Sequence, residues 1–513
     1  MRLRLTNGIS RIRQRGVAVL LLVVTLILGA AAVFYGLTTA TSPEIERDRK
    51  TAEALATAKA ALIGYATGVA IDDSVSVARL GDLPCPDRDD SGTPSPNFGS
   101  VTCNVQTGRI GRLPWKTLGL PDLRDGDGER LWYAVSTNFK NDTRTDCTAS
   151  APEATTCLNS ETRGTITIRD PAGNIKYDAT NTDPANSGVI AVIFSPGAVL
   201  RRQGTLQNRS CVGGAGCNLA GLCLGATTPK CDPINYLDID PSSTEDNGDF
   251  TDSNTNGFIN GIIRDASGNV VVNDRLIVIT YQDLMPQLEK RVTGEISKCL
   301  VGYANANFGR YPWAAPLTAI ITPFKDGIGA WFGRVPDLPL WRTKFADVPV
   351  AEPPVSSVDM AFDFACTAEP NKCMTSQWPS ASGCNLPTDP TQNSWWNNWK
   401  LQIFYAVADA YKPQIVYTQP MPPTVQLGTI PVPPSCPACL TVNPPNATAD
   451  KQFVVIAAGR RLPGISGGQP RTSPLNLRTA VNYLEGENNN SDSIFTKQSA
   501  STTFNDAVVF FPP

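Results

Sequence analysis

The sequence contains no histidine among its 513 residues. A Ser-His-Asp or Cys-His catalytic centre is therefore excluded, as is any metal site that needs an imidazole ligand. Paired carboxylates remain available for an exported hydrolase, but no particular pair stands out in the sequence. We therefore expect a protein that is not an enzyme.

The sequence also lacks an excess of charge of either sign, since its formal net charge is −3. A chain so balanced has no bulk electrostatic attraction to nucleic acid, and we expect no nucleic-acid partner. The local exception is a group of arginines near the N-terminus, which is typical of the cytoplasmic flank of a membrane segment. These are Arg2, Arg4, Arg11, Arg13 and Arg15.

No charged residue occurs between Val17 and Leu37. A bilayer is crossed by about 20 apolar residues in a helix, so this run predicts a transmembrane helix. After Pro43 the sequence becomes rich in Ala, Glu, Lys and Leu, and its apolar residues recur with helical spacing at Leu55, Ala58, Leu62 and Tyr65. This pattern predicts that the apolar helix continues, past a kink at Pro43, into an amphipathic helix.

Three interpretations of this N-terminal segment stay open. It could be a secretory signal peptide, with Ala30, Ala31 and Ala32 as a small-residue site cleaved before Val33. It could be an uncleaved membrane anchor. The third interpretation takes account of the single glycine, Gly16, that separates the basic residues from the apolar run.

A basic leader that ends in glycine, followed by an apolar stretch and an amphipathic helix, resembles the N-terminus of type IV prepilins and pseudopilins. The resemblance implies that a prepilin peptidase cuts between Gly16 and Val17 and that Val17 becomes methylated. It implies as partners this peptidase, the inner membrane and other pilins or pseudopilins. The fifth mature position, usually glutamate in this family, is Leu21. An apolar residue there is typical of the large minor pseudopilin at a filament tip.

The body of the chain resembles two copies of one unit. Each copy begins with a helical segment that ends in Gly-Tyr-Ala, and short matches then follow in the same order. The matched segments are 42–66 with 285–304, 111–123 with 333–341, 129–136 with 399–409, 188–197 with 452–464, 234–250 with 481–495, and 272–281 with 504–513.

The segments LWYAVS, GVIAVIF and RLIVITY are β-branched and aromatic, and Gly, Pro, Asn and Asp bound them. They therefore predict strands. We expect an α+β fold: a long transmembrane-plus-amphipathic N-terminal helix, then two tandem pilin-like units, each a helix packed on a small antiparallel sheet. The expected organisation is a basic leader at 1–16, a transmembrane or filament-core helix at 17–41, a first pilin-like domain at 42–283 and a second at 284–513.

All 14 cysteines follow the apolar run, and several are closely spaced. In an exported chain, this spacing predicts disulfides that close loops. Zinc is the alternative, but all-cysteine zinc sites suit a reducing compartment better. The candidate disulfide cysteines are Cys147 with Cys157, Cys211 with Cys217, Cys223 with Cys231, and Cys436 with Cys439.

The stretch DSNTNGFI, from Asp252 to Ile259, matches the first eight positions of a D-x-N-x-N-G-x-I calcium loop. Asp252, Asn254 and Asn256 are the candidate calcium ligands. The twelfth position, which usually supplies an acidic ligand, holds Ile263, so Asp249 or Asp265 would have to replace it. The alternative is a solvated polar loop.

Three further motifs are assigned ordinary structural roles. DRDDSG (87–92) and DGDGE (125–129) are predicted to be acidic turns. SCPAC (435–439) has the Cys-x-x-Cys spacing of thiol oxidoreductases, but the prolines around it favour a structural disulfide. Trp395, Trp396 and Trp399 either belong to the core or form an exposed surface that binds a glycan or a protein.

These observations lead to one principal hypothesis and one alternative. The principal hypothesis is a non-catalytic minor pilin or pseudopilin of a type IV pilus or type II secretion-like filament. It would be held in the inner membrane of a Gram-negative envelope with a periplasmic body, and then assembled at the filament tip or in low copy. The alternative is an adhesin-like or ligand-binding periplasmic protein with a plain N-terminal anchor.

Overall fold

The structure is a computed structural model, and it describes only part of the chain. The described residues are 43–68, 79–94, 103, 109–140, 157–210, 217, 221–223, 228–243, 245–250, 257–307, 309–317, 324, 326, 330–337, 378, 384, 386, 395–413, 416–418, 424–426, 436, 438–444, 446–465, 468–471 and 475–512.

Helix α2 (Pro43–Gly68) begins at a proline, which is tolerated in a first turn because the amide there has no helical partner. Its buried positions recur every three or four residues and include Leu55, Ala58 and Leu62. The predicted amphipathic helix is therefore confirmed from Pro43 onward. The expected kink at Pro43 involves residues outside the described part of the chain.

Four strands form the first main sheet, in the order β1-β2-β5-β11, and every neighbouring pair is antiparallel. The predicted strands LWYAVS, GVIAVIF and RLIVITY are confirmed as β2, β5 and β11. Helix α2 packs against β5 and β11. The bounds are β1 (Ile110–Arg112), β2 (Trp132–Val135), β5 (Ala191–Ser195) and β11 (Arg275–Ile279).

Four later strands form a second sheet of the same design, in the order β12-β13-β18-β20, again antiparallel throughout. Helix α3 (Tyr281–Ala306) packs against β18 and β20. The bounds are β12 (Phe332–Arg334), β13 (Ile403–Val407), β18 (Phe453–Ala457) and β20 (Ala507–Phe511).

The two sheets also share their register. Trp132 lies opposite Arg112 and Phe194, just as Phe404 lies opposite Arg334 and Ile456. We call α2 with the first sheet and its loops the first repeat. We call α3 with the second sheet and its loops the second repeat.

A close backbone approach fixes the edge strand of both sheets. A Cβ atom on Gly111 would lie 2.7 Å from the carbonyl oxygen of Asp87, and one on Gly333 would lie 2.0 Å from that of Ala315. Only glycine allows these approaches. This close approach is the physical reason for the glycine of the Gly-Arg pair in both copies of the sequence.

The described part of the chain also contains five smaller sheets and several short helices. They are β3 (Ile168–Arg169), β4 (Ile175–Tyr177) and β8 (Phe258–Ile259); β6 (Arg201–Arg202) and β7 (Thr205–Leu206); β9 (Ile263–Arg264) and β10 (Val270–Val272); β14 (Val416–Thr418) and β15 (Thr424–Gln426); β16 (Leu440–Asn443), β17 (Asn446–Lys451) and β19 (Ile494–Thr496); α5 (Trp395–Trp399); and the 3-10 helices η3 (Pro184–Asn186), η4 (Pro233–Asn235), η8 (Lys400–Gln402), η9 (Asp409–Tyr411), η10 (Asn476–Arg478), η11 (Ala480–Asn482) and η12 (Gly486–Asn489).

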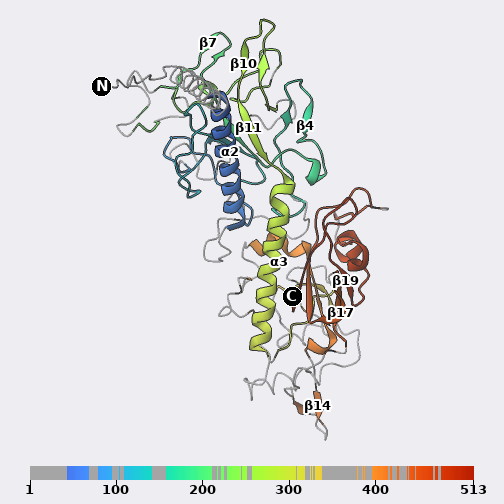
Figure 1. Cartoon of the computed structure of the whole chain (residues 1–513). Coiled ribbons are helices and arrows are strands. Elements are labelled where there is room, and N and C mark those ends of the chain that lie inside the picture. The colour runs from blue at the N-terminus through green and yellow to red at the C-terminus, as the bar shows by residue number, and fades with distance from the viewer. Residues whose placement is uncertain are drawn as a thin grey trace, which may run out of the picture.

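Helix α3 lies at the centre of the molecule. In Figure 1 it continues below α2, with strands of the second repeat beside it. Its first turn is tied to α2, because the Asp283 carboxylate accepts a hydrogen bond from the Thr280 backbone N–H at 2.8 Å and pairs with Lys59 at 2.9 Å. Leu288, Val292 and other side chains along α3 are fully buried in one continuous core that includes residues of both repeats.

The predicted fold class is wrong. We expected an α+β chain led by one long transmembrane-plus-amphipathic helix, with one small sheet per pilin-like unit. The described part of the chain is instead mostly sheet, with seven separate sheets and three α-helices, α2, α3 and α5. Among the described residues, no helix is both long and apolar enough to cross a membrane. The 42 prolines and 41 glycines explain the difference, because they divide the body into short strands and turns.

Disulfides are present, as predicted, and every cysteine that the structure describes takes part in one. Cys299 on α3 is joined to Cys384 across 85 residues of sequence, whereas Cys223 is joined to Cys231 across only 8.

Removing these two bridges is expected to have unequal effects. Loop-closure entropy gives a loss of about 4.5 kcal/mol of unfolding free energy for the Cys299→Ala, Cys384→Ala variant and about 2.5 kcal/mol for Cys223→Ala, Cys231→Ala. Chemical denaturation of the full chain under oxidising conditions measures both. Equal losses would show that the longer bridge does not constrain the unfolded chain as we infer.

Candidate functional site

An arginine on the edge strand of each repeat is stacked between two aromatic rings. The guanidinium carbon of Arg112 lies 5.0 Å from the ring centre of Trp132 and 4.5 Å from that of Tyr236. In the second repeat, Arg334 lies 4.0 Å from the ring centre of Phe404 and 4.4 Å from that of Tyr483. Cation–π attraction compensates part of the cost of burying the charge.

The two edge-strand arginines differ in their ionic partners. Arg112 Nε lies 3.1 Å from Asp90 Oδ1, and both side chains are buried. Arg334 donates to the carbonyl oxygen of Leu477 at 3.2 Å, and burial lowers its pKa to about 10. The first repeat therefore neutralises this buried cation with a carboxylate, while the second relies on the rings and a carbonyl.

Each repeat has a second arginine, Arg209 or Arg471, that forms hydrogen bonds with the chain just after a central strand, β5 or β18. Arg209 Nη1 donates to the carbonyl oxygen of Gly197 at 2.8 Å, and Arg471 Nη1 donates to that of Gly459 at 2.8 Å. Both arginines also donate to the backbone of the Asn-Tyr pair at the end of the short helix η4 or η11. The carbonyl acceptors there are Asn235 and Tyr236 for Arg209, and Asn482 and Tyr483 for Arg471.

Each repeat also buries two carboxyl groups next to this arginine. In the first repeat, Asp274 Oδ2 accepts from the backbone N–H of Asp238 at 2.7 Å, and Asp238 Oδ2 accepts from the N–H of Asn273 at 2.8 Å. Amide side chains complete the set, since Gln207 donates to Asp238 at 3.0 Å and Asn247 donates to Asp274 at 2.9 Å.

The second repeat reproduces this set of donors. Asp506 Oδ2 accepts from the N–H of Glu485 at 3.1 Å and from Asn488 at 2.9 Å. Glu485 accepts from the N–H of Asn505 at 3.0 Å and from Gln469 at 2.8 Å. All four carboxyl side chains are buried. Each pair therefore closes the loop after the short helix onto the last strand of its sheet.

The two repeats differ in the carboxylate that faces the second arginine. Arg209 Nη1 lies 3.2 Å from Glu129, which belongs to the same repeat and whose side chain is 29% exposed. Arg471 Nη1 lies 2.7 Å from Glu161, and both side chains are 0% exposed. Glu161 lies between β2 and β5, so the first repeat supplies the counterion of the second.

Glu161 belongs to a short loop that forms hydrogen bonds with backbone and side-chain groups of the second repeat. Its Oε1 accepts from the backbone N–H of Arg461 at 2.7 Å, and its Oε2 accepts from Arg461 Nε at 2.9 Å. Ser160 Oγ donates to the carbonyl oxygen of Ala458 at 2.9 Å. We call residues 158–161 together with Asn398, Ala458, Arg461 and Arg471 the junction.

Asn398 of α5 closes the other side of the junction. Its Oδ1 accepts from the N–H of Leu158 at 2.9 Å, and its carbonyl oxygen accepts from Asn159 Nδ2 at 3.0 Å. The junction therefore joins the two repeats through charge-assisted and neutral hydrogen bonds around Glu161, which pairs with both Arg461 and Arg471.

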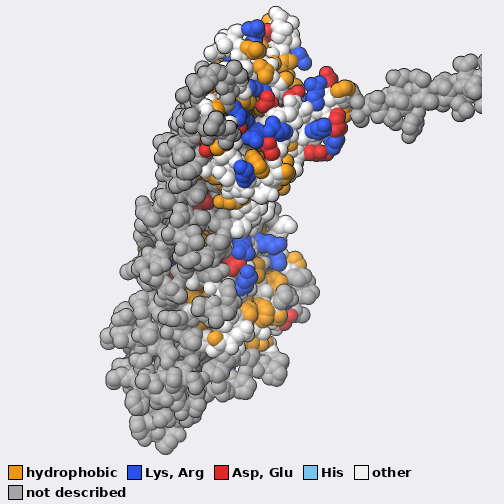
Figure 2. Space-filling view, turned by 90° about the vertical axis from the view of Figure 1, so that its left-hand side faces the viewer, with side chains coloured by type: hydrophobic (Ala, Val, Ile, Leu, Met, Phe, Trp, Pro, Cys, Tyr) orange, Lys and Arg blue, Asp and Glu red, His pale blue; other side chains and the backbone are white. Residues whose placement is uncertain are grey.

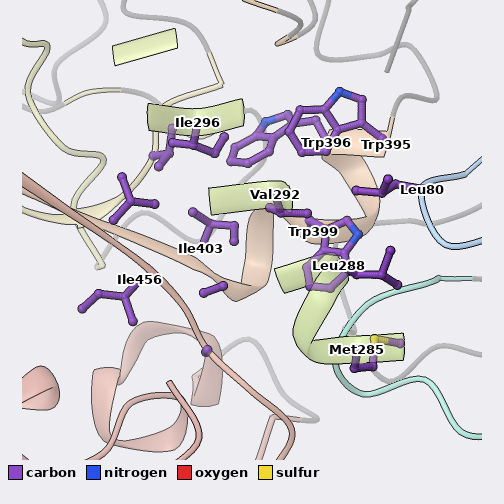
Figure 3. Packing of buried hydrophobic residues seen from close by; sticks show 14 of the residues in the cluster. Leu80, Met285, Leu288, Val292, Ile296, Trp395, Trp396, Trp399, Ile403 and Ile456 are labelled. Atoms are coloured by element: carbon purple, nitrogen blue, oxygen red, sulfur yellow. The ribbon is translucent and has the colours of Figure 1, made fainter. Parts of the chain in front are cut away.

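Next to Asn398, the tryptophan cluster of Trp395, Trp396 and Trp399 is part of the apolar core. Trp395, Trp396 and Trp399 are 5%, 0% and 0% exposed, and Figure 3 shows them beside the α3 side chains Leu288 and Val292. The core interpretation of this motif is confirmed, and these tryptophans form no exposed binding surface.

Both acidic motifs form turns, as predicted. In DRDDSG, Asp87 accepts from the backbone N–H groups of Asp89 and Gly92 at 3.1 and 2.6 Å, and burial raises the pKa of Asp87 to about 7. In DGDGE, Asp125 accepts from Ser195 Oγ at 2.7 Å and from the N–H of Gly197 at 3.1 Å.

The DGDGE turn also holds the start of α2. A Cβ atom on Gly126 would lie 2.3 Å from the carbonyl oxygen of Arg47, and the Gly126 N–H donates to Thr51 Oγ1 at 2.9 Å. Only glycine permits this approach. The turn therefore links the first described helix to the first sheet.

The predicted calcium ligands are only partly within the described chain. Asp252, Asn254 and Asn256 lie outside it. Asp265 caps its own hairpin turn, where it accepts from the N–H groups of Ser267 and Asn269 at 2.9 and 2.8 Å, and hydrogen bonding by Asn269 lowers its pKa. Asp249 lies in the loop before the motif. Among the described residues no group of three or more acidic or cysteine side chains is placed to hold a metal ion.

The candidate disulfide cysteines are bonded wherever the structure describes them. Cys223 pairs with Cys231, and Cys436 pairs with Cys439. Cys157 and Cys217 also take part in disulfides, while Cys147 and Cys211 lie outside the described residues. Spacing alone missed the pairs Cys85 with Cys103 and Cys299 with Cys384.

The carboxyl pairs and the junction are not among the sites predicted from the sequence. A signal for the pairs was present, because INYLD matches VNYLE and VND matches FND, which puts an acidic residue and an Asn-Asp pair at like places in both copies. The proposed cleavage and methylation site at Gly16 and Val17 lies outside the described residues. No protein-family model, curated protein sequence or solved structure matches this chain.

Breaking the junction ion pair is expected to cost far more than breaking its counterpart. Glu161→Gln leaves Arg471 buried without its counterion, so we expect a loss of about 3–5 kcal/mol of unfolding free energy. Glu129→Gln removes the partly exposed partner of Arg209 and is the matched control, with an expected loss of about 0–1 kcal/mol. Urea unfolding of the full-length variants measures both losses, and similar values would contradict the assignment of Glu161 as the junction counterion.

Proposed function

We propose that this chain is a non-catalytic minor pilin or pseudopilin, a low-copy or tip subunit of a type IV pilus or type II secretion-like filament. A prepilin peptidase would cut it between Gly16 and Val17, and Val17 would then be methylated. The chain would be held in the inner membrane with its body in the periplasm before it joins other pilins or pseudopilins.

The observation that carries this proposal is the order of residues at the N-terminus. Five arginines precede Gly16, and no charge follows until after Leu37. Positive charge favours the cytoplasmic side, so the Gly16–Val17 bond would face the cytoplasm. The uncharged run needs an apolar surrounding, which either lipid or neighbouring subunits can supply.

The position of Leu21 bears on the place of the subunit in the filament. A glutamate at the fifth mature position would pair with the N-terminus of a neighbouring subunit, and leucine cannot form that ion pair. We therefore infer a tip or low-copy position rather than that of a major repeating subunit.

The described body suits a mechanical role. The junction and the shared core around α3 join both repeats into one unit, and disulfides within each repeat stabilise its loops, so the body could carry load from its anchor. Charged side chains of both signs are interspersed on the described part of the surface in Figure 2, as expected of a solvated periplasmic face.

Two features motivate the adhesin-like alternative, the tryptophan cluster and the disulfide-rich loops. Trp395, Trp396 and Trp399 are buried, and disulfides alone do not indicate a ligand. Nothing else among the described residues favours a ligand-binding face, so we do not carry this alternative further.

Mass spectrometry of the intact protein from membrane fractions tests the proposal. We expect a mature chain that begins at Val17 with an N-methyl group. Replacing Gly16 with valine puts a bulky side chain at the cleaved bond, so the precursor should accumulate with Met1 or residue 2 at its N-terminus. Gly8→Val is the matched control, because it changes a leader glycine away from the bond and should leave processing intact.

Two results would contradict the proposal. A mature chain that begins at Val33 would indicate a secretory signal peptide and a released periplasmic protein. A wild-type chain that keeps the whole leader would indicate a plain membrane anchor.

A further inference from the structure

The strongest unexplained feature of the molecule is the carboxyl pair beside the junction. Glu485 follows η11, and Asp506 precedes β20; their side chains are 3% and 4% exposed. The N–H of Glu485 donates to Asp506 Oδ2, and the N–H of Asn505, the residue before Asp506, donates to Glu485 Oε2, so the two carboxyl groups lie next to each other. Two neighbouring carboxyl groups that are both buried resist ionising together, so we infer that one of the two carries a proton.

The other contacts indicate which group holds the proton. Both Glu485 oxygens accept from N–H donors, one from Gln469 and one from Asn505. Asp506 Oδ2 likewise accepts from N–H groups, but Asp506 Oδ1 is buried and accepts from no donor among the described residues. A proton on Asp506 Oδ1 would turn this buried acceptor into a donor toward Glu485.

The first repeat supplies independent support for this reading. Asp238 and Asp274 are held by the same kinds of donor, and Asp274 Oδ1 is also buried with no donor among the described residues. The same free oxygen therefore occurs at the same place in both copies.

Other charged side chains lie close to the two carboxyl pairs, Glu485 with Asp506 and Asp238 with Asp274. Glu485 faces Arg471 of its own repeat and Glu289 of α3, while Arg460 and Arg471 face Glu289. In the first repeat, Arg202 and Arg209 face Asp238, and Arg209 also faces Asp274. Burial is the largest cause that raises the pKa of all four acids.

Only the second pair is connected to the junction. Gln469 donates to Glu485 from Nε2, and its Oε1 accepts from Arg471 at 3.4 Å and from the N–H of Leu462 at 2.9 Å. Arg471 in turn holds Glu161 at 2.7 Å. A continuous path of polar contacts therefore runs from Asp506 through Glu485, Gln469 and Arg471 to the loop supplied by the first repeat.

We propose that the proton shared by Glu485 and Asp506 keeps the junction between the two repeats closed, and that its loss at higher pH loosens the junction. The inference does not depend on the filament function. Removal of the proton leaves two buried negative charges in contact, and their repulsion would push the loop after η11 away from β20. Gln469 would then lose its position against Arg471.

The direction of the pH effect follows from proton binding. An acid whose pKa is raised by folding binds more protons in the folded state than in the unfolded state. Its stabilising contribution is therefore present at low pH and is lost as pH rises through the raised pKa. The closed junction should thus be favoured at mildly acidic pH.

Distance measurement between the repeats tests the proposal on the full chain in detergent. Spin labels on non-natural residues would replace Ala172 in the first repeat and Ala500 in the second, both exposed. At about pH 5 we expect one narrow distance distribution, and at about pH 9.5 a broader one, since the pKa of a buried carboxyl group can be raised to about 9.

Two isosteric variants identify the group responsible. Asp506→Asn keeps the shape of the side chain and can donate to Glu485 without a titrating proton, so its distribution should stay narrow at both pH values. Asp274→Asn makes the same change in the first repeat, away from the junction, and should broaden as the wild type does. Infrared spectroscopy at neutral pH should show a protonated carboxyl band in the wild type that Asp506→Asn weakens.

Three outcomes would overturn the proposal. The first is a wild-type distribution that does not change with pH, and the second is an Asp506→Asn distribution that broadens like the wild type. The third is the absence of any carboxyl band that Asp506→Asn weakens, and it would overturn the shared proton even if the Asn variant unfolded.

Discussion

The ion pair between Glu161 and Arg471 is the interaction on which the arrangement of the two repeats depends. Both side chains are fully buried, and an unpaired charge in such a place is strongly unfavourable. The pair therefore forms only when the first repeat is seated on the second. The bonds of Ser160 and Asn398 and the packing of the tryptophans around α3 then follow from that contact.

The two repeats use the same kind of buried arginine, Arg209 or Arg471, but its carboxylate partner comes from a different place in each. In the first repeat, the DGDGE turn fills the space beside Arg209 and holds α2 against the sheet. In the second repeat, Arg471 pairs instead with Glu161, a carboxylate that the first repeat supplies. The Arg209–Glu129 ion pair lies within the first repeat, whereas the Arg471–Glu161 ion pair connects the two repeats.

Local patterns in the sequence were enough for part of the fold. The strands β2, β5 and β11 were predictable because β-branched and aromatic residues lie between Gly, Pro, Asn and Asp. The buried face of α2 was predictable from the spacing of Leu55, Ala58 and Leu62. The turns of DRDDSG and DGDGE were predictable because aspartate favours such backbone conformations. Each of these features is decided within about ten residues of chain.

Features that join distant residues were not predictable in this way. Glu161 is separated from Arg471 by 310 positions and has no matched residue in the second copy, so repetition gave no sign of it. The Cys299–Cys384 bridge spans a long separation, which a search for close spacing ignores. The sheet-rich architecture was not predictable because short polar hairpins such as β6 with β7 carry little hydrophobic pattern. The carboxyl pairs are formed by residues from two loops, and only the fold shows that they meet.

The two repeats behave as a single cooperative unit because the junction connects them. Amide hydrogen exchange tests this claim most directly, because two backbone N–H groups cross from one repeat to the other: Leu158 to Asn398, and Arg461 to Glu161. We predict that both amides exchange as slowly as those of the central strand β18. Exchange as fast as at the exposed turn amide of Gly173, with β18 still protected, would show that the repeats part readily and would contradict it.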